Sequence, residues 1–235
     1  MRRSYSAALL LSAVLSLALP GGGVTAASPN SIVLHGAHGG SNLKLSVRGE
    51  RLVVRGLMSR EQPVGCHLRR SRLKAVCRLD RVASIRVDMG PSGDMVRVAD
   101  RLTVPLAVYL GGGSDKFIGN GERDFCYPGG HRRNRCIGRG GDDVCITGPR
   151  NSDCVGGRGN DYCEHGTGSD GCWGGPGRDV CRMGPGHDGC HGGAGNDWLY
   201  GGSSSDRLYG GGGRDHCDGG PGWGKSQSCE AGPRR

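Results

Sequence analysis

Residues 156–218 read as seven consecutive nonapeptides, GGRGNDYCE, HGTGSDGCW, GGPGRDVCR, MGPGHDGCH, GGAGNDWLY, GGSSSDRLY and GGGGRDHCD. The sixth position of every nonapeptide is aspartate, so seven carboxylates recur at a constant interval of nine residues. Glycine dominates the first four positions, and cysteine or leucine fills the eighth. A fixed period of this kind predicts a repeat architecture in which each unit packs against its neighbour.

The nonapeptide resembles the RTX, or hemolysin-type, calcium-binding repeat, whose pattern is G-G-x-G-x-D-x-U-x with a large apolar residue at U. This resemblance implies an all-β fold, a parallel β-roll (a β-solenoid) with two nonapeptides in each coil. It also implies that Ca²⁺ is the cofactor and that aspartates 18 residues apart stack in one row. Seven aspartates of the regular repeats and three of degenerate upstream copies are therefore the predicted metal ligands: Asp161, Asp170, Asp179, Asp188, Asp197, Asp206, Asp215, Asp115, Asp124 and Asp143.

Stacking of these aspartates creates the need for a cation. Neighbouring strands of a sheet lie about 4.8 Å apart, and two carboxylates at that spacing repel by about 3 kcal/mol at an effective dielectric constant of ~20. Calcium suits flexible sites of six to eight oxygen ligands, whereas magnesium requires a tighter octahedron. The gaps between stacked aspartates of the regular repeats predict about five calcium sites.

Two upstream units depart from the pattern. Asn134 stands where one aspartate is expected, and Asp153 lies one position late in another. Asp94, in the segment 90–96, is a further degenerate match. The sequence therefore does not predict a complete calcium site at the units of Asn134 and Asp153.

All twelve cysteines are candidates for disulfide bonds, because an even number of thiols in an oxidising compartment can pair completely. They are Cys66, Cys77, Cys126, Cys136, Cys145, Cys154, Cys163, Cys172, Cys181, Cys190, Cys217 and Cys229. Cys66 and Cys77 bracket a short segment and are expected to bridge each other. The eight from Cys126 to Cys190 hold the inward U position, where free thiols acting as small apolar side chains are the alternative to bridges.

Two pairings of these eight cysteines remain open. Bridges across the core would join Cys126–Cys136, Cys145–Cys154, Cys163–Cys172 and Cys181–Cys190. Bridges along one face would join Cys126–Cys145, Cys136–Cys154, Cys163–Cys181 and Cys172–Cys190. We favour the bridges across the core, because the Cβ bonds of stacked residues run parallel and suit a disulfide poorly.

The chain divides into regions of different composition. Residues 1–27 combine a basic start, an apolar stretch and small residues, which predicts a signal peptide, a secreted (extracellular) protein and no membrane span after its removal. Residues 28–81 are expected to form an N-terminal β-strand cap, with a hairpin at 43–54. Residues 82–227 would form the roll, including short strands at 84–87 and 106–110, and residues 228–235 a C-terminal tail.

Positive charge concentrates ahead of the repeats, where residues 28–110 hold 14 Lys and Arg against 6 Asp and Glu. The densest cluster is Arg69, Arg70, Arg72, Lys74, Arg78 and Arg81. It indicates either a solvated strand face or contact with an acidic or glycan surface polymer. Nucleic acid is not expected as a partner, because no aromatic residue for base stacking lies within 67–85.

The sequence favours a structural or surface-interaction role over an enzyme. His187, Asp188, Cys190 and His191 contain the residue types of a nucleophile cluster, yet each fills a repeat position that would send Cys190 inward and His191 outward. The alternative function is an adhesin or lectin-like module, in which Trp173, Trp198, Tyr200 and Tyr209 contact glycans. The two differ in whether the outward aromatic faces are free to bind a sugar.

Overall fold

The computed structural model describes residues 30–37, 39–56, 66–68, 74–130, 132–222, 225–227 and 229. All of the regular structure in these residues is β-strand, which confirms the predicted all-β class. In the same part of the chain, no helix reaches the length and apolar character that crossing a membrane requires. The predicted signal peptide, Arg69, Arg70, Arg72 and most of the predicted tail lie outside the described residues.

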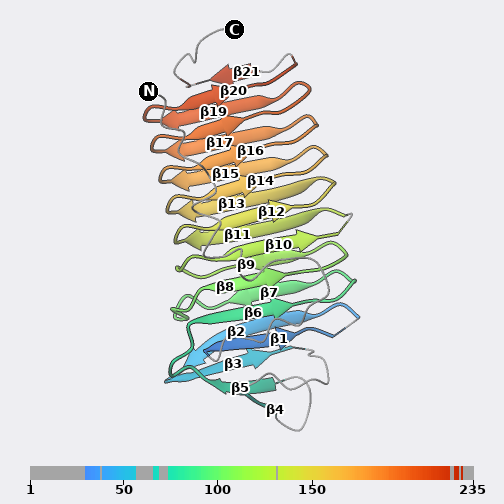
Figure 1. The fold of residues 1–235 in the computed structure, drawn as a ribbon, viewed down its shortest axis with the longest axis vertical. Coiled ribbons are helices and arrows are strands. Elements are labelled where there is room, and N and C mark those ends of the chain that lie inside the picture. The colour runs from blue at the N-terminus through green and yellow to red at the C-terminus, as the bar shows by residue number, and fades with distance from the viewer. Residues whose placement is uncertain are drawn as a thin grey trace.

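The strands form two sheets that face each other along the whole stack (Figure 1). The nine-stranded sheet has the order β1 (Ser31–His35), β6 (Ser84–Asp88), β8 (Leu106–Tyr109), β10 (Phe125–Gly129), β12 (Val144–Thr147), β14 (Tyr162–Glu164), β16 (Val180–Arg182), β18 (Trp198–Tyr200) and β20 (His216–Asp218). The twelve-stranded sheet has the order β21 (Lys225–Gln227), β19 (Arg207–Gly212), β17 (Gly189–Ala194), β15 (Gly171–Pro176), β13 (Ser152–Arg158), β11 (Asn134–Gly140), β9 (Lys116–Ile118), β7 (Met95–Val98), β2 (Asn42–Arg48), β3 (Arg51–Arg55), β5 (Lys74–Arg78) and β4 (Cys66–Leu68).

From β5 onward, successive strands alternate between the two sheets, so that each coil contributes one strand to each. Strands one coil apart pair in parallel, and in the regular repeats the paired residues are 18 apart, as Cys163 and Cys181 are. The tight turns between sheets depend on glycine at particular positions. Gly175, for example, has φ 121°, and a Cβ there would lie 2.0 Å from the carbonyl oxygen of Gly157 in the previous coil. Two nonapeptides per coil, the predicted β-roll, are confirmed.

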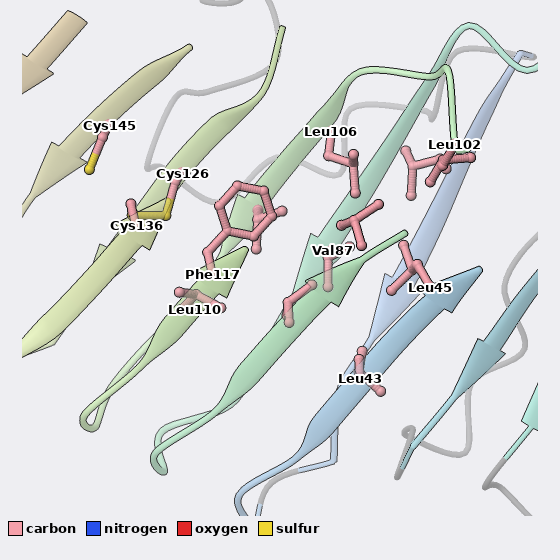
Figure 2. Close-up of a cluster of buried hydrophobic side chains, with 14 of the residues drawn as sticks. Leu43, Leu45, Val87, Leu102, Leu106, Leu110, Phe117, Cys126, Cys136 and Cys145 are labelled. Atoms are coloured by element: carbon pink, nitrogen blue, oxygen red, sulfur yellow. A yellow bond between two sulfur atoms is a disulfide. The ribbon is translucent and has the colours of Figure 1, made fainter. Parts of the chain in front are cut away.

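The interior between the sheets changes in composition along the stack. In the first coils it is filled by aliphatic side chains such as Leu43, Leu45 and Leu106, all 2% exposed or less. From Cys126 to Cys190 cysteines take over the inward position, as Figure 2 shows for Cys126, Cys136 and Cys145, and Leu199 and Leu208 fill it after that. Because cysteine is a small apolar residue, the C-terminal coils bury less apolar volume per residue than the N-terminal ones.

The N-terminal strands share the sheets of the roll. β1 pairs with β6 and β2 pairs with β7, both in parallel, so β1 and β2 form the first coil of the stack. Beyond β2 the pairing becomes antiparallel, through β3 and β5 to β4. The hairpin predicted at 43–54 is confirmed as β2–β3, and β6 and β8 confirm the strands predicted at 84–87 and 106–110.

Candidate metal sites in the turns

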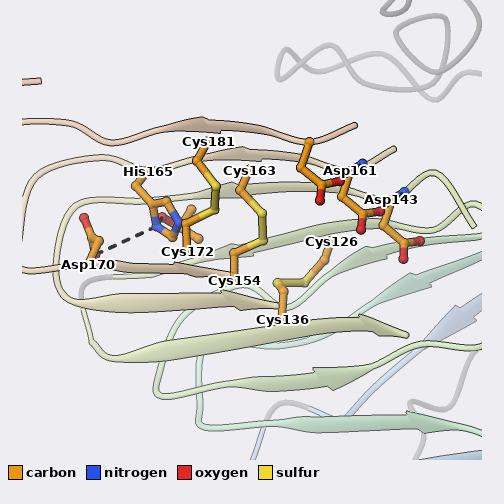
Figure 3. The surroundings of a disulfide bond; sticks show 12 residues. Cys126, Cys136, Asp143, Cys154, Asp161, Cys163, His165, Asp170, Cys172 and Cys181 are labelled. Carbon is orange, nitrogen blue, oxygen red and sulfur yellow. Dashed lines mark hydrogen bonds and ion pairs between the residues drawn. A yellow bond between two sulfur atoms is a disulfide. The ribbon is translucent and has the colours of Figure 1, made fainter. Parts of the chain in front are cut away.

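The aspartates lie in the turns at the two opposite edges of the roll. The first row occupies the turns that lead from the twelve-stranded to the nine-stranded sheet and holds Asp124, Asp143, Asp161, Asp179, Asp197 and Asp215. The second row occupies the return turns and holds Asp94, Asp115, Asp170, Asp188 and Asp206. Figure 3 shows Asp143 and Asp161 at one edge and Asp170 at the other. All eleven side chains are buried.

One oxygen of each carboxylate ties its coil to the coil before it. The backbone N–H of Asp161 donates to Oδ1 of Asp179 at 2.8 Å, and that of Asp179 donates to Oδ1 of Asp197 at 2.8 Å. In the second row the N–H of Asp170 donates to Oδ1 of Asp188 at 2.7 Å. This ladder confirms that aspartates 18 residues apart stack, and it explains why each turn repeats the conformation of the previous one.

The other oxygen, Oδ2, is buried and has no hydrogen-bond partner in ten of these aspartates. They are Asp94, Asp115, Asp143, Asp161, Asp170, Asp179, Asp188, Asp197, Asp206 and Asp215. A buried acceptor left unpaired costs about 1–3 kcal/mol, so ten in one small protein require an explanation. Asp124 is the exception among the predicted ligands, because its Oδ2 accepts the N–H of Asn120 at 3.0 Å.

A second oxygen from the next coil converges on the same space in the first row. A Cβ at Gly174 would lie 2.4 Å from Oδ2 of Asp179 and 2.5 Å from the carbonyl oxygen of Gly192. The same pair of oxygens, a carboxylate Oδ2 of the same turn and a glycine carbonyl of the next coil, surrounds the Cβ position at Gly119, Gly138 and Gly192. Carboxylate and backbone carbonyl oxygens are the hard ligands that calcium prefers. The residues present therefore fit a calcium ion.

Substitution of Gly174 is expected to disturb the first row by filling this space. In Gly174→Ala the new methyl group would contact both converging oxygens, so we expect weaker calcium binding and lower thermal stability in calcium. Gly189→Ala is a matched control, because a Cβ at Gly189 meets nothing within 4 Å. Calcium titrations and melting curves of the two variants make the comparison, and equal effects would show that the space at Gly174 has no special role.

In the second row Gly201 keeps the arrangement of the first, since a Cβ there would lie 2.7 Å from Oδ2 of Asp206 and 3.0 Å from the carbonyl oxygen of Gly219. The other two regular nonapeptides of this row begin with a different residue. His165 and Met183 stand there, where the first row has glycine, and both are buried. His165 Nδ1 lies 3.1 Å from Oγ1 of Thr147 and 4.0 Å from Oδ1 of Asp170 (Figure 3). Burial lowers the pKa of His165 to about 4, so its ring is neutral at pH 7. We did not predict a role for His165 and Met183 at the metal sites. The signal in the sequence is that they replace the glycine with which most of the nonapeptides begin.

Burial also changes the ionisation of the aspartates. It raises the pKa of Asp161 and Asp188 to about 7 and that of Asp170 and Asp179 to about 6, against which backbone hydrogen bonds act. The pKa of Asp143 rises to about 9, because burial is reinforced by neighbouring carboxylates. Without a cation, these groups are costly to ionise at neutral pH.

The two irregular units lose the charge of the row, and the side chain of Asn134 keeps the hydrogen bond of the ladder. Asn134 is buried in the second row, and its Oδ1 accepts the N–H of Asp115 at 2.8 Å. In the next coil Ser152 takes the row position, while Asp153 points away and pairs with Arg133 at 3.1 Å. The second row is therefore interrupted for two coils between Asp115 and Asp170.

Ten of the twelve cysteines form bridges. Cys66–Cys77 is confirmed, and Cys217 pairs with Cys229. Across the core, the structure joins Cys126–Cys136, Cys154–Cys163 and Cys172–Cys181 (Figure 3). Bridging across the core agrees with the arrangement that we favoured, but Cys145–Cys154, Cys163–Cys172 and Cys181–Cys190 are wrong. Each inward cysteine has two possible partners across the core, the cysteine before it and the cysteine after it in the sequence. Cys154 and Cys172 each pair with the cysteine that follows, whereas we had predicted the cysteine that precedes.

This shift leaves Cys145 and Cys190 as buried free thiols. Each lies beside a bridge, because the sulfur atoms of Cys126, Cys136 and Cys145 are within 4.8 Å of one another, as are those of Cys172, Cys181 and Cys190. Burial raises the pKa of both thiols well above its usual range. Cys190 is 0% exposed whereas His191 is exposed on the outer face, so the two do not form a nucleophile pair.

The fold and its turns define a disulfide-braced parallel β-roll with two ladders of buried aspartates. The RTX calcium-binding nonapeptide repeat matches this chain in four copies, at residues 155–172 and 191–222. These two segments are therefore similar to RTX calcium-binding repeats, in agreement with the resemblance that the nonapeptides predict. Neither the curated proteins nor the solved structures contain a match to the chain.

Proposed function

We propose that this chain is a secreted calcium-binding repeat protein in which Ca²⁺ between stacked turns holds the roll in shape. Its role is structural or one of surface interaction rather than catalytic. The observation that carries the proposal is the set of ten buried Oδ2 atoms without a partner, repeated from coil to coil. Secretion is supported by the predicted signal peptide and by five disulfides, which persist in oxidising compartments.

Each ion would be held by this chain's own oxygens. Oδ2 of Asp161, Asp179 and Asp197, with carbonyl oxygens of the following coil, would supply ligands in the first row, and Asp170, Asp188 and Asp206 in the second. A bound ion supplies positive charge that neutralises the stacked carboxylates. The ladder of backbone hydrogen bonds to Oδ1 already fixes the spacing of the coils, so the protein orients the ligands before the ion arrives.

Calorimetric titration of the mature chain with Ca²⁺ tests the proposal. Affinities in the range of extracellular modules, about 10⁻⁴–10⁻³ M, are expected. The double variant Asp179→Asn, Asp197→Asn should bind fewer ions, because asparagine keeps the Oδ1 acceptor, as Asn134 does, but removes the charge. Asp153→Asn is the control and should bind as the wild type does. An absence of calcium uptake at millimolar concentrations would overturn the proposal.

The outward aromatic residues do not favour the lectin-like alternative. The ring centroids of Trp173 and His191 are 6.3 Å apart with planes at 3°, and those of His191 and Tyr209 are 4.6 Å apart at 12°. These rings stack on one another along the roll, so the faces that they turn toward one another are not free, although Trp173 as a whole is 41% exposed. Sugar binding by stacking needs free ring faces, and we develop the lectin-like function no further.

A further inference from the structure

The outer face of the twelve-stranded sheet is strongly basic at its N-terminal end, where β5, β3, β2 and β7 lie side by side (Figure 1). On β2, the exposed Lys44 alternates with the buried Leu43 and Leu45, which places Lys44 on the face turned away from the core. The same alternation places Arg97 of β7 outward between two buried valines. The outward positions of these four strands therefore share one surface.

The register of the strands brings seven cations of this surface into two rows. In the first row Lys74 pairs with Arg55, Arg55 with Lys44, and Lys44 with Arg97. In the second row Arg78 pairs with Arg51, and Arg51 with Arg48. We call these seven residues the cation rows. The two rows lie four residues apart along each strand, which corresponds to about 14 Å.

Folding does not account for this arrangement. Like charges directly opposite one another on neighbouring strands are destabilising, and here four follow one another across four strands. Arg78 is neutralised by Asp80 at 2.8 Å. Among the described residues, the other six cations form no ion pair. The positions between the rows, Ser46, Val53 and Val76, pair with one another and carry no charge.

We propose that the cation rows bind a linear acidic polysaccharide that lies across the strands, parallel to the axis of the roll. Regularly spaced carboxylate or sulfate groups would meet Lys and Arg on successive strands, and arginine suits such groups because its planar fork donates two hydrogen bonds. The surface is distinct from the calcium sites, since it lies on a sheet face and the aspartates lie in the turns. Lys74 and Arg78, predicted as part of a polymer-binding cluster, belong to it.

Nucleic acid fits this surface less well. In the part of the chain that the structure describes, this face is formed by paired strands and offers no helix to enter a groove of duplex DNA. β2, β3, β5 and β7 contain no aromatic side chain on which a base of a single strand could stack. A polyanion recognised by charge spacing alone, without base contacts, is the partner that remains.

Binding of heparin by the full mature chain tests the proposal. In the variant Lys44→Gln, Arg55→Gln, Arg97→Gln, we expect the Kd for a heparin oligosaccharide to rise about ten-fold or more at fixed salt, because three charge contacts and their released counterions are lost. The control variant Arg158→Gln, Arg178→Gln, Arg207→Gln removes the same charge from exposed residues elsewhere on the roll and should bind as the wild type does.

Three further measurements decide the outcome. The melting temperature of the first variant should equal or exceed that of the wild type, because opposed like charges are removed, and the single variant Lys44→Gln replaces it if the triple variant does not fold. Heparin binding should persist when calcium is chelated at a temperature where the chain stays folded, which separates this proposal from the calcium proposal. Equal loss of affinity in both triple variants, no heparin binding by the wild type, or equal affinity for single-stranded DNA of matched charge would overturn it.

Discussion

Chelation of calcium together with reduction of the disulfides is expected to unfold the C-terminal coils, whereas chelation alone should leave them partly folded. The interior of these coils is built mainly from cysteines, with Met183, Leu199 and Leu208 as the larger apolar residues, so little aliphatic burial remains once both supports are removed. Three bridges cross this core, Cys126–Cys136, Cys154–Cys163 and Cys172–Cys181. Each is worth about 2–4 kcal/mol, enough to offset much of the carboxylate repulsion that chelation releases.

Far-ultraviolet circular dichroism in EDTA, before and after reduction, measures this effect. The first coils, with an aliphatic core that includes Leu43, Leu45 and Leu106, should supply the signal that survives both treatments. Thiol titration of the denatured, unreduced protein is the control and should find two thiols, Cys145 and Cys190. Complete loss of β-structure in EDTA alone would contradict the expectation that the bridges hold the roll.

Acidity is expected to stabilise the calcium-free roll, which is the second large effect. Burial raises the pKa of Asp161 and Asp188 to about 7 and that of Asp179 to about 6, whereas an unfolded aspartate has a pKa of about 3.9. Between about pH 4 and pH 7 the folded roll therefore binds more protons than the unfolded chain. By linkage, its stability falls as pH rises through this window.

Saturating calcium should reverse the trend, because the ion binds the ionised carboxylates and its uptake releases protons. Melting temperatures from about pH 4.5 to pH 7.5, in EDTA and in calcium, should therefore diverge as pH rises. The disulfides are kept oxidised throughout, so that only the carboxylates and the ion change. A melting temperature in EDTA that increases with pH would show that the buried aspartates do not control the stability of the calcium-free state.

The sequence by itself determined the architecture and the rows of aspartates. A period of nine with glycine at its start and aspartate at its sixth position admits few backbones, because each coil must reproduce the turn of the coil before it. Even the irregular units could be located in this way, since Asn134 and Asp153 depart from the pattern of one aspartate at the sixth position of each unit. Whether these aspartates bind calcium remains a prediction of the same pattern.

Three features were decided only by the tertiary structure. The pairing of the inward cysteines could not follow from spacing, because Cys154 is nine residues from both Cys145 and Cys163 and only the geometry selects Cys163. The position of His165 beside Asp170 in the second row was not predictable either, because it depends on the direction in which the first residue of a nonapeptide points. The cation rows combine residues of four strands through two antiparallel pairings, β2–β3 and β3–β5, and one parallel pairing, β2–β7. The nine-residue period determines how each coil winds. Contacts between residues whose separation in sequence is not a multiple of this period form only when the sheets have assembled.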